Sequence, residues 1–177
     1  STEDSDAFHG DYVELLHVWP KAISGYSFIK STSSSTPSYI LFTDKETGNI
    51  YEAISPDYKK RRLTDTTFLN VQKTVFTPDG EYVAMSYFNS NDKKINPTQT
   101  LIISEIPRIE NGPLNTDNII DENIIDITTF SGEDIQKNSD LITYLKKTKD
   151  NFSELYIYNI KTEEKNKLLE IPLTDIF

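Results

Sequence analysis

The stretch TVFTPDGEYVA, residues 74–84, decides the fold class. Proline at the second position and glycine at the fourth position of TPDG are the residues that a β-turn favours. The turn is flanked by Val71 to Phe76 on one side and by Glu81 to Phe88 on the other. Both flanks are rich in the β-branched and aromatic residues that suit strands. This stretch therefore predicts an antiparallel hairpin.

The same kind of unit is found on both sides of this hairpin. Before it, residues 39–42 form an expected strand that ends at 44–48, where Gly48 supplies the positive φ that a tight turn needs. The chain then returns through 49–54 and runs on through 62–64. After it, residues 124–128, 141–145 and 154–160 have strand character. Four short strands in meander order are typical of one propeller blade.

The spacing of these units favours a propeller over a sandwich. Their second strands begin at Tyr39, Tyr82 and Leu141, at intervals close to the roughly 40–50 residues of one blade, and the last interval contains an insertion. A related hairpin also occurs twice, because the pair Ile50 and Leu63 has the same separation as Leu155 and Leu168. The sequence predicts an all-β fold of about three four-stranded antiparallel blades.

The expected organisation has an acidic tail or linker over residues 1–18 and a partial β-propeller over 19–177. Its blades cover about 19–66, 67–122 and 123–170, and residues 171–177 begin a further strand. Three blades do not close a ring, because propellers have at least about four, and an unclosed blade leaves an apolar face and strand edges exposed. We therefore expect the remaining blades to come from further sequence or from a partner chain.

Residues 74–84 resemble the repeat of WD-like propellers, including the TolB-like and dipeptidyl-peptidase propellers, in which an SPDG turn precedes an alternating apolar strand. The repeat is degraded at 44–48 and at 131–134. The layout is also similar to that of bacterial surface propellers, which implies an extracytoplasmic location, in the periplasm or at the cell surface. The resemblance implies a scaffold, but no activity and no site residue, because propellers have unrelated functions.

Composition narrows the classes of partner. The chain has 177 residues, 36% of them hydrophobic, which is enough for one folded domain. Its net charge of −10 disfavours nucleic acid, and its one basic cluster, residues 59–62, is interpreted as a solvated strand edge rather than a phosphate site. It has no cysteine for disulfides or thiolate sites. No apolar run approaches the roughly 20 residues that cross a bilayer.

The sequence predicts no catalytic, cofactor-binding or metal-binding residue, and no cofactor. Its six glycines are dispersed and form no nucleophile elbow, phosphate loop or dinucleotide fingerprint. His9 and His17 lack the spacing that places two imidazoles on one helical face. Two acidic clusters offer oxygen ligands for Ca²⁺ but lack the EF-hand pattern, and we interpret them as surface carboxylates: residues 3–6, and Asp117 with Asp121, Glu122 and Asp126.

Aromatic residues are the other candidates for a binding surface. Trp19 and the tyrosines on the expected strands are candidates for such a surface. We expect four of these tyrosines to pack between blades instead: Tyr51, Tyr87, Tyr144 and Tyr156. Residues 151–153 match a glycosylation sequon, a short pattern that also arises by chance.

These observations leave two main hypotheses for the function, which belong to different classes. The first is a non-enzymatic scaffold that binds a protein partner through the loops 31–36, 89–98 and 107–118. The alternative is the propeller of a prolyl-oligopeptidase-like serine hydrolase whose catalytic domain is absent from this chain. A calcium-dependent adhesive propeller is a third hypothesis.

Overall fold

A computed structural model gives the fold. It describes residues 17–31, 37–64, 67–88, 99–106, 122–131, 140–148 and 152–172, and in β8 it describes the side chain of Ile127 alone. Every regular element in these ranges is a β-strand, which confirms the predicted all-β class. Within the same ranges, no helix is long and apolar enough to cross a membrane.

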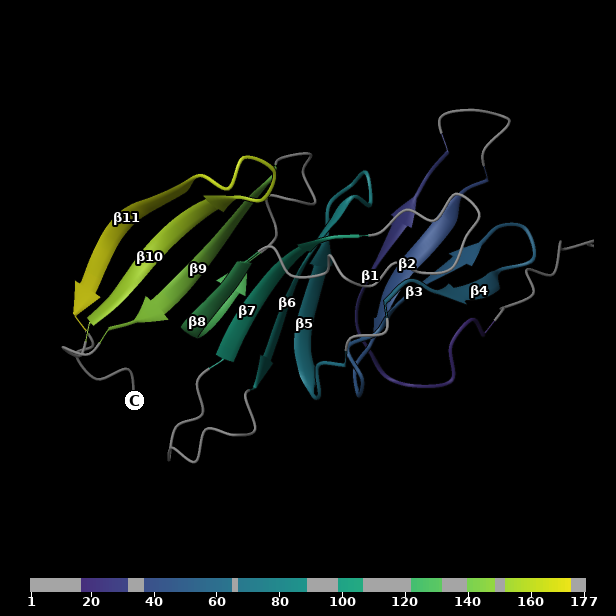
Figure 1. Ribbon diagram of the computed structural model, residues 1–177, viewed down its shortest axis with the longest axis horizontal. Helices are drawn as coiled ribbons and strands as arrows, with labels where there is room; N and C mark the ends of the chain where they lie inside the picture. The colour runs from purple at the N-terminus through teal and green to yellow at the C-terminus, as the bar shows by residue number, and fades with distance from the viewer. Residues whose placement is uncertain are drawn as a thin grey trace, which may run out of the picture.

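The described strands follow one another along the chain. They are β1 (Ile23–Ile29), β2 (Tyr39–Asp44), β3 (Ile50–Ile54), β4 (Lys59–Arg62), β5 (Val71–Phe76), β6 (Tyr82–Phe88), β7 (Gln99–Glu105), β8 (Glu122–Ser131), β9 (Leu141–Lys147), β10 (Phe152–Asn159) and β11 (Lys165–Pro172). All neighbouring pairs are antiparallel, in a four-stranded sheet β1-β2-β3-β4 and a seven-stranded sheet that runs from β5 to β11. Figure 1 shows them arrayed in chain order, with β1–β4 at one end and β11 at the other.

The seven-stranded sheet folds over at β8. The start of β8 pairs with β7 and its end pairs with β9, with a register shift in each ladder. Lys161, in the turn after β10, lies 2.7 Å from Asp79, in the turn after β5. In a flat sheet these two turns would be about 20 Å or more apart, because neighbouring strands are about 4.8 Å apart. The strands therefore form three layers: the first layer is β1–β4, the second is β5–β7 and the third is β9–β11.

The second layer is buried on both of its faces. Along β6, Val83 and Met85 belong to the core that it shares with Leu41 and Ile50 of the first layer. Ala84, which has the opposite orientation in the pleat, belongs to a separate core that includes side chains of the third layer. Because the layer is covered on both faces, consecutive residues along β6 and β7 are buried.

The hairpin predicted from residues 74–84 is confirmed. The backbone N–H of Thr77 donates to the carbonyl oxygen of Tyr82, and that of Gly80 donates to the carbonyl oxygen of Thr77. Gly80 has a φ of 70°, and a Cβ built there would lie 3.0 Å from a methyl group of Leu41. Glycine is therefore favoured by both the left-handed backbone and the contact with the first layer.

Two strands differ in extent from the expectation. The strand expected over 62–64 is β4, Lys59–Arg62. Ile171 and Pro172, expected to open a further strand, are the end of β11, where they pair with Ser153 and Phe152. Residues 173–177 lie outside the described residues.

Candidate binding groove

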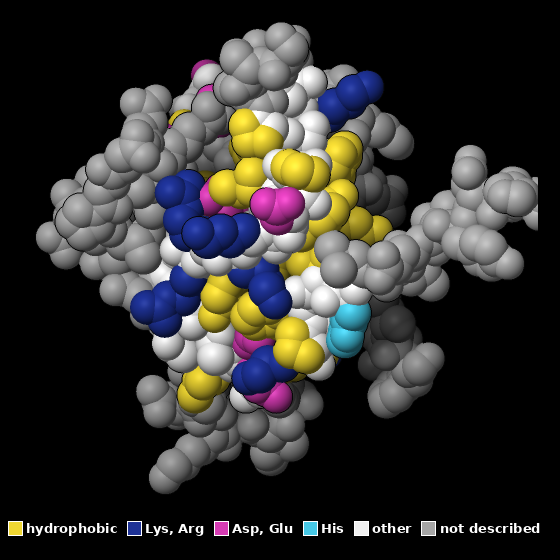
Figure 2. Space-filling model, turned by 90° about the vertical axis from the view of Figure 1, so that its right-hand side faces the viewer, with side chains coloured by type: hydrophobic (Ala, Val, Ile, Leu, Met, Phe, Trp, Pro, Cys, Tyr) yellow, Lys and Arg dark blue, Asp and Glu magenta, His cyan; other side chains and the backbone are white. Residues whose placement is uncertain are grey.

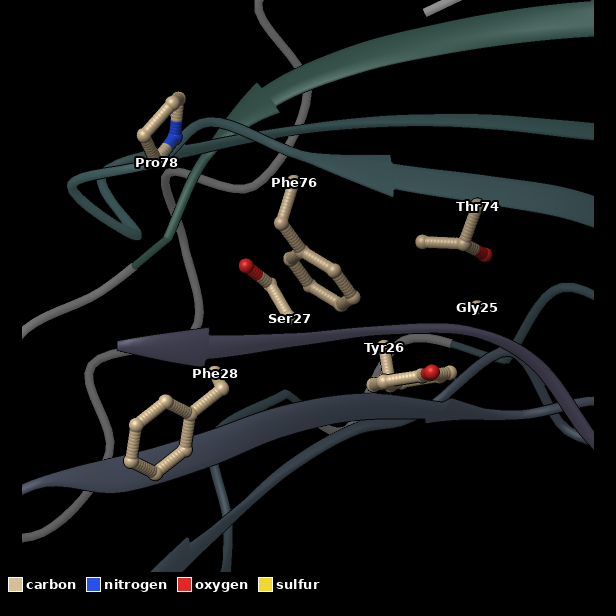
Figure 3. Close-up of a pocket in the computed structure, with 7 residues that line it drawn as sticks. All are labelled: Gly25, Tyr26, Ser27, Phe28, Thr74, Phe76 and Pro78. Carbon is tan, nitrogen blue, oxygen red and sulfur yellow. The ribbon is translucent and has the colours of Figure 1, made fainter. Parts of the chain in front are cut away.

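An open pocket of about 470 Å³ lies between β1 and β5, the edge strands of their two sheets (Figure 3). The residues that line it come from both strands and from the turn that follows β5: Gly25, Tyr26, Ser27, Phe28, Thr74, Phe76 and Pro78. Because the two strands belong to different layers, the groove depends on how the first layer packs on the second.

Gly25 brings the two strands together at one end of the groove. A Cβ built on Gly25 would lie 2.1 Å from the carbonyl oxygen of Thr74, so no other residue fits without a backbone shift. Beside it, the hydroxyl groups of Ser24 and Thr74 are 2.7 Å apart and share a hydrogen bond. Further along, Ser27 and Phe76 face one another across the gap in Figure 3.

The groove lining consists of aromatic, hydroxyl and small side chains. Its described lining contributes the ring of Phe76, the exposed ring of Pro78 and the hydroxyl of Ser27, but no carboxylate, imidazole or amine. The Tyr26 ring projects from the other side of β1 (Figure 3).

A second surface is the face of the first layer that points away from the second layer (Figure 2). Here the Trp19 ring lies 5.1 Å from that of Phe42 and 4.5 Å from that of Tyr51. Trp19 Nε1 donates to Asp44 Oδ2 at 3.3 Å, and the Lys60 ammonium lies 5.8 Å from the indole centroid. These contacts fix Trp19 against the sheet.

Asp44 is the acidic member of this cluster. Burial alone would raise its pKa, but hydrogen bonds from the backbone and hydroxyl of Thr47 and from Trp19 outweigh burial and lower the pKa. Asp44 therefore stays ionised, and it connects Trp19 to the turn that follows β2.

The basic cluster predicted as a solvated edge forms the whole of β4, and all four side chains are exposed. Arg61 forms an ion pair with Glu52 on β3. Lys60 and Arg62 pair with Ala53 and Tyr51, which places both cations on the same face as Trp19.

The other polar candidates do not converge. His17 is exposed, whereas His9, residues 3–6, Asp117 and Asp121 lie outside the described residues. Glu122 and Asp126 are in β8, but the structure does not describe their side chains. Among described side chains, no group of three His, Asp or Glu residues is arranged to hold a metal ion.

Three of the four candidate tyrosines pack at cores shared by two layers. Tyr144 and Tyr156 stack at 5.2 Å within the core shared by the second and third layers, and Tyr87 packs 5.4 Å from Phe68. Tyr51 is on the outward face of the first layer instead.

The remaining candidates fall largely outside the described residues. In the sequon, Ser153 is buried in β10, and Asn151 is outside the described residues. Three loops were expected to bind a partner, and Ser31 is the one residue of these loops that the structure describes. Its backbone N–H donates to Ser38 Oγ at 3.0 Å. Residues 32–36, 89–98 and 107–118 are not among the described residues.

Sequence reasoning missed the groove because its two sides are about fifty residues apart in the chain, as in the Ser24–Thr74 pair. The one available indication was Gly25, since a glycine inside a strand often marks the close approach of another backbone. No protein-family model matches the chain, and no curated protein matches it.

Proposed function

We propose that the chain is a non-enzymatic β-propeller scaffold, located in the periplasm or at the cell surface, that binds a protein partner. The three antiparallel layers are taken as its blades, and the groove between β1 and β5 as the place where a segment of the partner is held. The observation that carries the proposal is the groove lining, which offers aromatic and hydroxyl groups and no ionisable group on the groove side. Such a lining suits an apolar side chain of a peptide.

The serine-hydrolase alternative makes a different prediction. It places the nucleophile in a separate domain, so its specific prediction is a G-x-S-x-G motif elsewhere in the same reading frame. Labelling of the native protein by a fluorophosphonate probe would favour the hydrolase over the scaffold.

The scaffold is tested by photo-crosslinking from the groove in the source cell. A benzophenone amino acid at Pro78, which is exposed at the groove, is expected to trap one discrete protein. The same probe at Gln72, exposed on β5 but not part of the groove lining, is the matched control.

A second experiment uses a variant that fills the groove. Ser27→Phe is expected to abolish the adduct from position 78, because the larger side chain occupies the gap in front of Phe76. Lys73→Phe, on the exposed side of β5, should leave the adduct unchanged. Identical adducts from positions 78 and 72, or an adduct that survives Ser27→Phe, would contradict the proposal.

A further inference from the structure

Phe28 and Phe76 have the same position in two successive layers. In the first layer, Phe28 of β1 pairs with Ile40, the second residue of β2. In the second layer, Phe76 of β5 pairs with Val83, the second residue of β6. The two hairpins therefore share a register, and the same face of each layer carries the phenylalanine.

The burial of the two phenylalanines differs sharply. Phe76 is 3% exposed because the first layer covers it, whereas Phe28 is 56% exposed and its neighbour Tyr26 is 70% exposed. The outer face of the first layer, defined here as Tyr26, Phe28, Ile40, Phe42 and Tyr51, thus repeats the kind of face that the second layer buries. Trp19 covers Phe42 and packs on Tyr51, so the exposed part of this face is centred on Tyr26 and Phe28. Figure 2 shows hydrophobic side chains gathered on this side of the molecule, with Lys and Arg side chains among them.

The third layer has an apolar face at the opposite end of the stack. Tyr144 and Tyr158 point into the core shared with the second layer, so Leu145, Leu155 and Ile157, which alternate with them, point away. Leu169 and Ile171 of β11 pair with Leu155 and Ser153, and are 45% and 41% exposed. These five residues, Leu145, Leu155, Ile157, Leu169 and Ile171, are the outer face of the third layer.

We propose that a second copy of this chain covers both faces, with the outer face of the third layer of each copy packed on the outer face of the first layer of the other. Within one chain, the second layer already presents one face to the first layer and the opposite face to the third. Repeating that head-to-tail contact between copies closes a ring of six layers, within the four to eight blades of propellers. This inference goes beyond the proposed partner binding. Tyr26 and Phe28 border the groove, but their rings project from the other side of β1, where the second copy would pack.

The smaller of the two faces limits the size of each contact. Four strands about 4.8 Å apart and about 20 Å long give the face of the first layer roughly 400 Å², and three strands give the face of the third layer roughly 300 Å². A ring with two such contacts would bury about 1,200 Å² in total, at the lower end of the range of specific interfaces.

Local charge on the two faces is complementary in the ring. The cations Lys60 and Arg62 lie on the outer face of the first layer. There they meet carboxylates of the second copy, although the net charge of −10 makes two copies repel one another overall. In the ring, β4 lies at the same side of its layer as β11, next to the turn that carries the exposed Glu163 and Glu164.

The test is the mass of the 177-residue chain in solution, measured by light scattering after gel filtration at micromolar concentration. We expect about twice 20.3 kDa for the unmodified chain. Phe28→Glu and Leu169→Glu each place a charge in both contacts of the ring, and each is expected to give a folded species of 20.3 kDa. Leu69→Glu is the matched control, because Leu69 is also 56% exposed but lies in the segment before β5 and is not one of the residues of either face.

Mixing the two variants distinguishes a head-to-tail ring from other arrangements. A mixed pair of Phe28→Glu and Leu169→Glu chains has one contact free of both substitutions, so mixing is expected to restore part of the dimer. A dimer that Phe28→Glu disrupts and Leu169→Glu does not would overturn the ring, because a symmetric contact between two first layers gives that result. An unmodified chain that stays at 20.3 kDa would also overturn it and assign the two faces to another protein or to further layers of a longer chain.

Discussion

Lys161 Nζ lies 2.7 Å from Asp79 Oδ2, although 82 residues separate them. Lys161 also approaches Asp140 at 3.5 Å and Glu81 at 3.9 Å, so one cation from the third layer meets three carboxylates. Asp79 is at the same time part of the TPDG turn, where its Oδ1 accepts hydrogen bonds from Thr77 Oγ1 at 2.6 Å and from the Glu81 backbone N–H at 3.0 Å. The turn that identified the hairpin therefore also joins the second and third layers.

Asp79→Asn should lower the free energy of unfolding by about 1–2 kcal/mol, because it removes the charge that Lys161 contacts and weakens the hydrogen bonds of the turn. The value is at the low end for a charged hydrogen bond because the Asp79 side chain is 35% exposed. Urea denaturation at pH 7 measures the change. Asp57→Asn, at an exposed turn position before β4, is the control and should change the stability by less than about 0.5 kcal/mol.

Asp79 should also make stability depend on pH. Burial alone would raise its pKa, but hydrogen bonds from Lys161, Thr77 and the Glu81 backbone outweigh burial and lower the pKa to about 2. Because the folded state favours the ionised carboxylate, this stabilisation is present at pH above the ordinary pKa of 3.8 and is lost as the pH falls towards 2.

The urea midpoints of the unmodified chain and of Asp79→Asn should therefore converge between pH 4 and pH 2, as Asp79 becomes protonated. A gap between the midpoints that stays constant through this range would show that Asp79 acts through the shape of the turn and not through its charge.

The strands were predictable because their determinants are local. Pro78 and Gly80 specify a turn between two β-rich flanks, and Gly48 does so for the hairpin of β2 and β3, where its φ is 70°. The weaker prediction was β4, because Lys59 to Arg62 has no apolar alternation, and its strand conformation comes from pairing with β3.

The groove and the aromatic face were not predictable because they depend on contacts between distant segments. Gly25 acquires its importance from Thr74, and Trp19 becomes fixed only when β2 and β3 bring Phe42 and Tyr51 together. Tyr51 and Tyr144 both lie on strands with alternating side chains. Tyr144 is buried because another layer covers its face, whereas Tyr51 lies on the outer face of the first layer.

Gly25→Ala should destabilise the fold by about 1–3 kcal/mol, because the added methyl group would lie 2.1 Å from the Thr74 carbonyl oxygen and must push β1 away from β5. Ser24→Ala is the control at the adjacent residue. It removes one hydrogen bond to Thr74 and should destabilise by about 1 kcal/mol or less. Thermal unfolding of both variants measures the difference, and a Gly25→Ala variant as stable as the unmodified chain would show that the two strands are not held this close.

Trp19→Ala should destabilise the fold by about 2–4 kcal/mol, because it uncovers Phe42 and removes the ring contacts and the hydrogen bond to Asp44. Tyr26→Ala is the matched control on the same face. The Tyr26 ring is 70% exposed, so its removal should change the free energy of unfolding by less than about 1 kcal/mol. Both substitutions are compared by urea denaturation in the Phe28→Glu background, which keeps association between copies out of the measurement. Equal losses for the two variants would mean that Trp19 is no better packed than Tyr26 and that the aromatic cluster adds little to the stability of the first layer.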